Sequence, residues 1–190
     1  MNRQIYKTDL TNDQWAVLEP LLPPPSVRGR PREHSLREIL NAIFYIVDGG
    51  IKWRSMPHDL PPWQSVYYYF RQWTKSGRWE QLNTTLREQV RQKAGRNPEP
   101  SAAVIDSQSV KTTEEAAADT RGYDSGKQIK GRKRHLLVDT IGLVLKVVAL
   151  AAHIQDRDGA QTLFGKIRGT FIRLKKVWAD GAYAGPKLGD

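Results

Sequence analysis

The 190-residue chain contains no cysteine, so it has neither disulfides nor thiolate metal ligands. It has no apolar run near the ~20 residues that a membrane-spanning helix needs, and residues 1–10 lack the apolar core of a signal peptide. Acidic side chains are scarce, since 20 Asp and Glu stand against 30 Lys and Arg, and the formal charge is +10. These features predict a cytoplasmic protein that has no membrane partner and binds a polyanion.

The positive charge is spread evenly along the chain. Residues 1–100 and residues 101–190 each carry 15 basic and 10 acidic side chains. This excludes a basic tail on a neutral domain and favours a surface contributed by two basic units. A glycine and two prolines at 95–100 end the helical pattern, and a strand pattern follows. We therefore predict two domains, 1–97 and 98–190.

The first domain is expected to be helical. Thr11 with Gln14 and Ser35 with Glu38 each fit a capping box. Apolar spacing then predicts helices from Thr11 to Pro23, from Ser35 to Gly49, from Trp63 to Gly77 and from Trp79 to near Gly95. The third of these mixes aromatic and basic residues: Tyr67, Tyr68, Tyr69, Arg71 and Lys75. Such a stripe is either packed core or part of a helix-turn-helix-like DNA-reading unit, and the basic charge favours the second.

Three arginines lie between the first two predicted helices. Arg28, Arg30 and Arg32 alternate with glycine and proline, a pattern that excludes regular structure. Residues 26–34 are either a solvated loop, which the sequence alone slightly favours, or an arm along a phosphate backbone. In the second case the three arginines are DNA contacts.

Two apolar runs in the second domain end in an aspartate. Residues 102–111 read as a buried strand that presents Asp106, and residues 177–183 repeat the pattern with Asp180. Trp178 is expected in the core, directly below the second aspartate. Either aspartate alone more often caps a turn. Together, two carboxylates at strand ends could share a divalent metal ion.

A basic run lies between the two aspartates. Its members, in a window without acidic residues, are Lys127, Lys130, Arg132, Lys133 and Arg134. It leads into a strand at 135–139 that pairs as a hairpin with residues 143–152, so we expect the run at a sheet edge, where it is solvated or contacts DNA phosphates. A helix from Asp156 to Gly169 and a strand at 172–179 follow. His135 and His153 are expected to be packing histidines.

This order of elements is the opening of an RNase H-like domain, in which the first and fourth strands are neighbours. Asp106 and Asp180 would then meet at adjacent strand ends. There they could bind Mg²⁺ or Mn²⁺ ions about 3.5–4 Å apart, which serve phosphodiester chemistry. The predicted fold class is α+β, with a helical, helix-turn-helix-like N-terminal domain followed by an incomplete RNase H-like α/β domain with a mixed sheet.

Several segments in the same order resemble the DDE transposases of bacterial insertion sequences, in the group numbered four and five. They are residues 10–15, 49–54, 62–67, 104–111, 131–140 and 179–183. The resemblance implies that Asp106 and Asp180 are the first two catalytic and metal-binding carboxylates. It also implies a Mg²⁺ or Mn²⁺ cofactor, double-stranded DNA as partner (the inverted repeats of the element and target DNA), a homo-oligomer in the active complex and a place at the bacterial nucleoid.

The third carboxylate of that family, a glutamate on a later helix, has no counterpart. Ten residues follow Asp180, and Asp190 is the sole acid among them. We therefore expect the amino-terminal portion of a transposase, truncated by frameshifting or decay, that binds the inverted repeats with little or no strand transfer of its own. The alternative is a non-catalytic DNA-binding protein that competes with the full transposase and binds DNA without metal.

Overall fold

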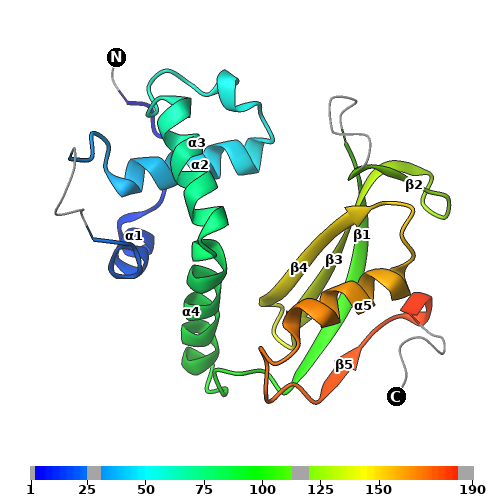
Figure 1. The fold of residues 1–190 in the computed structure, drawn as a ribbon. Coiled ribbons are helices and arrows are strands. Elements are labelled where there is room, and N and C mark those ends of the chain that lie inside the picture. Colours follow the sequence, from blue (N-terminus) through cyan, green and yellow to red (C-terminus); the bar gives the residue numbers. More distant parts are fainter. Residues whose placement is uncertain (1–2, 25–30, 113–119, 184–190) are drawn as a thin grey trace. The chain divides into compact units, whose positions relative to one another are not determined.

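The computed structural model describes residues 3–24, 31–112 and 120–183 (Figure 1). Helices come first in the chain and a mixed sheet with a helix follows, which confirms the predicted α+β class. The chain forms two compact units, Met1–Leu82 and Asn83–Asp190. They divide inside helix α4 (Arg78–Lys93), earlier in the chain than the domain boundary expected from sequence at 97/98. None of the described helices is both long and apolar enough to cross a membrane.

Helices make up the first unit. They are α1 (Asn12–Leu18), the short 3-10 helix η1 (Glu19–Leu21), α2 (Leu36–Gly49), the 3-10 helix η2 (Trp53–Ser55), α3 (Trp63–Lys75) and the start of α4. The capping box at Thr11 forms as predicted. At Ser35 one half forms, because Glu38 accepts from Arg3 and Asn41 instead of from the Ser35 backbone. Gly50 ends α2 with a φ of 59°, a backbone conformation that favours glycine.

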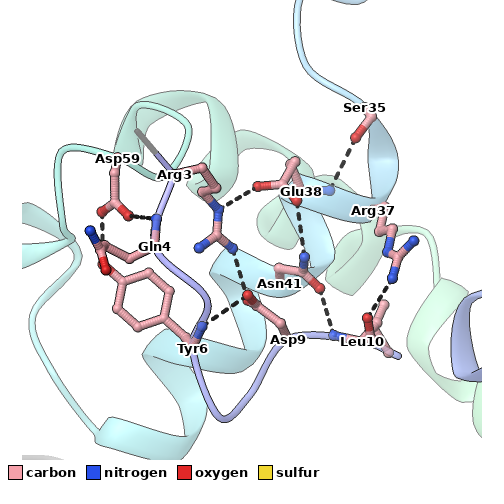
Figure 2. Close-up of polar contacts among 10 residues, drawn as sticks. All are labelled: Arg3, Gln4, Tyr6, Asp9, Leu10, Ser35, Arg37, Glu38, Asn41 and Asp59. Carbon is pink, nitrogen blue, oxygen red and sulfur yellow. Dashed lines mark hydrogen bonds and ion pairs between the residues drawn. The ribbon is translucent and has the colours of Figure 1, made fainter. Parts of the chain in front are cut away.

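The residues before α1 are held by a network of polar contacts (Figure 2). The Arg3 guanidinium lies 2.8 Å from carboxylate oxygens of both Asp9 and Glu38. The Leu10 backbone N–H donates to Asn41, and the Tyr6 hydroxyl donates to Asp59 at 2.7 Å. The bond to Asp59 raises the pKa of Tyr6 to about 12. These contacts fasten the N-terminal segment to the helices of the first unit.

The second unit is a mixed sheet. Its elements are β1 (Ala102–Lys111), β2 (Gly122–Asp124), β3 (Ile129–Asp139), β4 (Val144–Ala151), α5 (Asp156–Ile167), β5 (Lys176–Trp178) and the 3-10 helix η4 (Gly181–Tyr183). β1 is antiparallel to β3 and parallel to β5, and β3 also pairs with β2 and β4. β3 is therefore an interior strand, and the edge position expected for the basic run is wrong. From Lys130 onward the run belongs to the strand itself, which begins at Ile129, and Lys127 lies in the turn before it.

One face of this sheet is covered by α5 (Figure 1), and the core lies between them. The core contains Ala103, Ile105, Leu137, Val148, Ala160 and Leu163. Alternate side chains point to the opposite face, which we call the open face: Val104, Asp106, Gln108, Arg134, Leu136, Val147 and Trp178. Trp178 is 44% exposed and Val104 is 38% exposed. The predictions of a core position for Trp178 and of a fully buried strand at β1 are therefore wrong, because these side chains lie on the face opposite α5.

The second half of α4 is fastened to the β3–β4 hairpin. Arg91 forms a buried ion pair with Asp139 and donates from Nε to the Asn97 carbonyl at 2.7 Å. The other Asp139 oxygen accepts from the backbone N–H groups of Ile141 and Leu143. Arg87 lies over the Phe171 ring, 5.3 Å from its centroid. These contacts explain why residues from Asn83 onward belong to the sheet unit.

Candidate active site and DNA-binding surface

Asp106 and Asp180 both lie shortly after the paired part of β1 and β5. Within the parallel β1–β5 pair, Ala102 lies opposite Lys176 and Val104 opposite Trp178. Asp106 and Asp180 each follow this last pair by two residues. Both residues are exposed. Asp106 accepts a hydrogen bond from the Ser107 backbone N–H at 2.7 Å. Asp106 lies within β1, which continues to Lys111, whereas Asp180 follows the end of β5, so only Asp180 stands at a strand end.

Tyr183 follows Asp180 by three residues. Its side chain is 4% exposed and packs in the core beside α5. The pKa of Tyr183 is raised to about 12, mainly by burial and in smaller part by the negative charges of Asp156, Asp106 and Asp180. Tyr183 also ends the short η4 turn that follows Asp180.

The donor atoms at this place fit a hard divalent cation. Carboxylate oxygens suit Mg²⁺ or Mn²⁺ better than soft metal ions. Within residues 3–24, 31–112 and 120–183, no group of three His, Asp or Glu side chains gathers to hold a metal. Asp106 and Asp180 therefore fit part of a coordination sphere, in which water and phosphate oxygens would supply other ligands.

Strand alternation divides the basic run between the two faces of the sheet. Lys130, Arg132 and Arg134 share the direction of the open face, whereas Lys133 and His135 point toward α5. Lys133 is 6% exposed, and its ammonium lies 3.0 Å from Asp156 and 3.4 Å from Asp124. Because the Lys133 ammonium is buried and paired with carboxylates, Lys133 does not belong to the DNA-binding surface that we propose below.

The other predicted DNA contacts are placed as follows. The Lys127 ammonium donates to the Ser107 carbonyl at 3.0 Å, beside Asp106. Arg132 donates to the Thr120 hydroxyl at 2.6 Å, and Lys130 is exposed. Arg32 donates to the carbonyls of Pro23 and Pro24. Arg28 and Arg30 lie outside the described residues.

A polar cluster between the sheet and α5 was missed by the sequence reasoning. Asp124 accepts from the Ser109 hydroxyl at 2.5 Å and lies in ion-pair range of Lys133. The bond from Ser109 is the largest cause that lowers the pKa of Asp124, to about 2, and the Lys133 charge contributes. His135 is fully buried beside this cluster, and burial lowers its pKa. The period-2 pattern of residues 133, 135 and 137 is the signal that could have revealed the cluster.

The lowered pKa of Asp124 predicts that the folded protein loses stability in acid. A carboxyl whose pKa is about 2 in the folded state and about 3.9 when unfolded stabilises the fold fully above pH ~4. This contribution is lost as the pH falls toward about 2. Asp124→Asn should therefore lower stability at neutral pH and flatten its decline between pH ~4 and ~2. Urea denaturation at a series of pH values measures both effects. Glu99→Gln, outside the cluster, should leave the slope unchanged, and an unchanged slope in Asp124→Asn would contradict the assignment.

Comparisons with known proteins agree across both units. A family model described as a transposase of IS4/5 family matches residues 10–83, and the transposase DDE domain model matches residues 97–190. The Insertion element IS402 uncharacterized 16.2 kDa protein of Burkholderia cepacia is 29% identical over 111 residues, which cover 55% of this chain and 74% of that protein. No solved structure gives a significant match. With helical part and sheet part both matched, the chain belongs to the IS4/5 family of DDE transposases.

Proposed function

We propose that this chain binds double-stranded DNA at the inverted repeats of its insertion sequence and contributes Asp106 and Asp180 to the metal site of strand cleavage and transfer. The observation that supports the proposal is the parallel pairing of β1 with β5, because each aspartate follows the last pair, Val104 and Trp178, by two residues. DDE transposase domains use divalent metal ions in general. The hard carboxylate oxygens of this pair favour Mg²⁺ or Mn²⁺.

A separate set of contacts positions each aspartate. Asp106 belongs to the long strand β1, and its carboxylate is oriented by the bond from the Ser107 N–H. Asp180 follows β5, and the buried Tyr183 anchors the turn after it, with its N–H donating to the Asp180 carbonyl at 3.2 Å. A divalent metal, when bound, would activate the attacking oxygen and stabilise the leaving oxygen of a phosphodiester. The chain's part is to hold the two carboxylates in position.

The DNA surface of the second unit consists of Lys127, Lys130, Arg132 and Arg134. Side chains of this type contact phosphates and position the duplex without reading its sequence. The same surface would serve the inverted repeats and the target DNA. A transposase must hold two element ends, so we propose that copies of the chain act together, at the nucleoid where the DNA lies.

Helix α3 supplies the proposed reading surface of the first unit. Tyr69, Phe70 and Trp73 pack against the helical core, which accounts for part of the aromatic stripe. Tyr68 is 58% exposed and shares the outer side of the helix with the exposed Arg71 and Lys75. α3 contains no acidic residue. An exposed helical surface that carries positive charge and no acidic side chain is suited to contact DNA rather than to pack in a protein core.

The test separates DNA binding from metal binding. A duplex carrying the terminal repeat should bind in EDTA, with an affinity that falls steeply as salt rises. Asp106→Asn and Asp180→Asn should not weaken this binding, but they should weaken Mn²⁺ binding by the protein–DNA complex on the order of tenfold or more, measured by electron paramagnetic resonance. The proposal fails if the wild-type chain does not bind DNA, or if the aspartate variants bind Mn²⁺ as tightly as the wild type.

The alternative is a DNA-binding protein that competes with a full transposase at its ends. The absence of a three-acid group among the described residues favours it. It predicts that neither aspartate affects any property of the DNA complex, and that added metal leaves the affinity unchanged. Strand transfer by the purified chain that disappears in Asp106→Ala would exclude this alternative.

A further inference from the structure

The open face of the sheet contains a groove beside Asp106. Its volume is about 440 Å³, and it is lined by Asp106, Ser107, Gln108, Arg134, Leu136 and Val147. Strand pairing sets Gln108 opposite Arg134 and Asp106 opposite Leu136, which in turn lies opposite Val147. The groove thus combines a carboxylate and a guanidinium with the apolar side chains of two neighbouring strands.

Arg134 differs from its neighbour Lys133 in the state of its charge. Lys133 points toward α5 and pairs with the carboxylates of Asp124, which is buried, and Asp156, which is partly buried. Arg134 is exposed and donates from Nη2 to the neutral Gln108 amide oxygen at 2.7 Å. Among the residues that the structure describes, no carboxylate pairs with Arg134. Its positive charge is therefore available to an anion that enters the groove.

We propose that Arg134 binds the non-bridging oxygens of the DNA phosphate that lies beside Asp106, with Gln108 orienting its guanidinium. The inference rests on the proposed function and deepens it, because it assigns the phosphate at the metal site to one residue. A phosphate placed against a carboxylate is repelled unless a cation lies next to it. The planar guanidinium fork matches two phosphate oxygens, and the apolar side chains strengthen such bonds by excluding water.

The neighbouring cations serve a different part of the DNA. Lys130 precedes Arg134 on β3 and is not among the residues that line the groove. Arg132 donates to the Thr120 hydroxyl. These side chains fit contacts with the phosphates that follow along the backbone. Lys130 therefore provides a matched control, since it is an exposed cation on the same strand but away from Asp106.

A double-mutant cycle with a short fluorescein-labelled duplex in EDTA tests the inference. Without metal, a phosphate bound by Arg134 is repelled by ionised Asp106, so Asp106→Asn should tighten binding on the order of fivefold. Arg134→Ala should weaken binding and abolish this gain, because the phosphate no longer occupies the groove. Lys130→Ala should weaken binding and leave the gain intact. Fluorescence anisotropy gives each affinity, and circular dichroism confirms the fold.

A second variant tests the guanidinium without removing it. Gln108→Glu sets a carboxylate against Arg134 and should weaken DNA binding as Arg134→Ala does. The inference is overturned if Asp106→Asn brings no gain, or if the gain persists in the Arg134→Ala background. In either case, salt-dependent DNA binding by the wild-type chain would leave the proposed function standing. A wild-type chain that does not bind DNA would overturn both.

Discussion

Arg91→Ala is expected to lower the free energy of unfolding of the second unit by about 3–5 kcal/mol. Arg91 is 5% exposed and Asp139 is 1% exposed, and the two form an ion pair. Removal of the guanidinium leaves the Asp139 carboxylate buried without its cation, and it also leaves the Asn97 carbonyl without the donor Nε. Urea denaturation followed by circular dichroism measures the loss.

Two further substitutions in α4 serve as comparisons for Arg91→Ala. Lys93→Ala removes an exposed cation from the last turn of α4 and should change stability by less than about 0.5 kcal/mol. Arg91→Lys keeps a positive charge but loses the planar fork, so its effect should lie between the two. A loss below about 1 kcal/mol in Arg91→Ala would show that the pair with Asp139 does not hold α4 to the hairpin.

Gly159→Ala should destabilise the second unit by about 1–3 kcal/mol, although alanine is the better helix former. Gly159 lies in α5, where it faces the ring of His135. A Cβ on Gly159 would lie 2.1 Å from His135 Nε2 and 2.2 Å from Cε1. The ring is fully buried on the sheet side, so α5 itself has to move. Thermal or urea denaturation gives the sign and the size of the effect.

Gly165→Ala on the same helix is the matched control. Apart from its chain neighbours and the adjacent backbone of α5, nothing lies within 4 Å of the position that its Cβ would occupy, and the residue is exposed. Here the ordinary preference of helices for alanine should act alone and raise stability by about 0.5–1 kcal/mol. Opposite signs for the two substitutions would establish the contact between α5 and His135, and equal signs would contradict it.

Local patterns in the sequence predicted most of the elements. The Thr11 capping box, the helix end at Gly49–Gly50 and the strand at 102–111 all appear as predicted. Each depends on residues a few positions apart, where spacing and capping chemistry act directly. The last strand is shorter than predicted, since only Lys176–Trp178 pairs with β1. Pairing with a distant strand sets that length, and no local pattern encodes it.

The candidate site was predicted only in part, again because local patterns do not encode the pairing of distant strands. Asp106 and Asp180 were singled out because an apolar run that ends in aspartate is a local signal, and the structure pairs β1 with β5, the strands that precede them in the chain or contain them. Lys133 was grouped with exposed cations because the strand was expected to begin at residue 135. With β3 beginning at Ile129, alternation sends Lys133 inward to Asp124 and Asp156.

The sequence by itself determined the charge of the protein, its helix caps, the order of its strands and, through these, its family. Only the tertiary structure decided which basic side chains are exposed and which are buried, that Trp178 lies on an open face, and that Arg134 shares a groove with Asp106. The physical reason is that composition and periodicity are properties of neighbours in the chain. Strand register and the partners of buried charges arise from contacts between distant residues. A shift of one residue in the register of a strand would turn each of its side chains to the opposite face of the sheet.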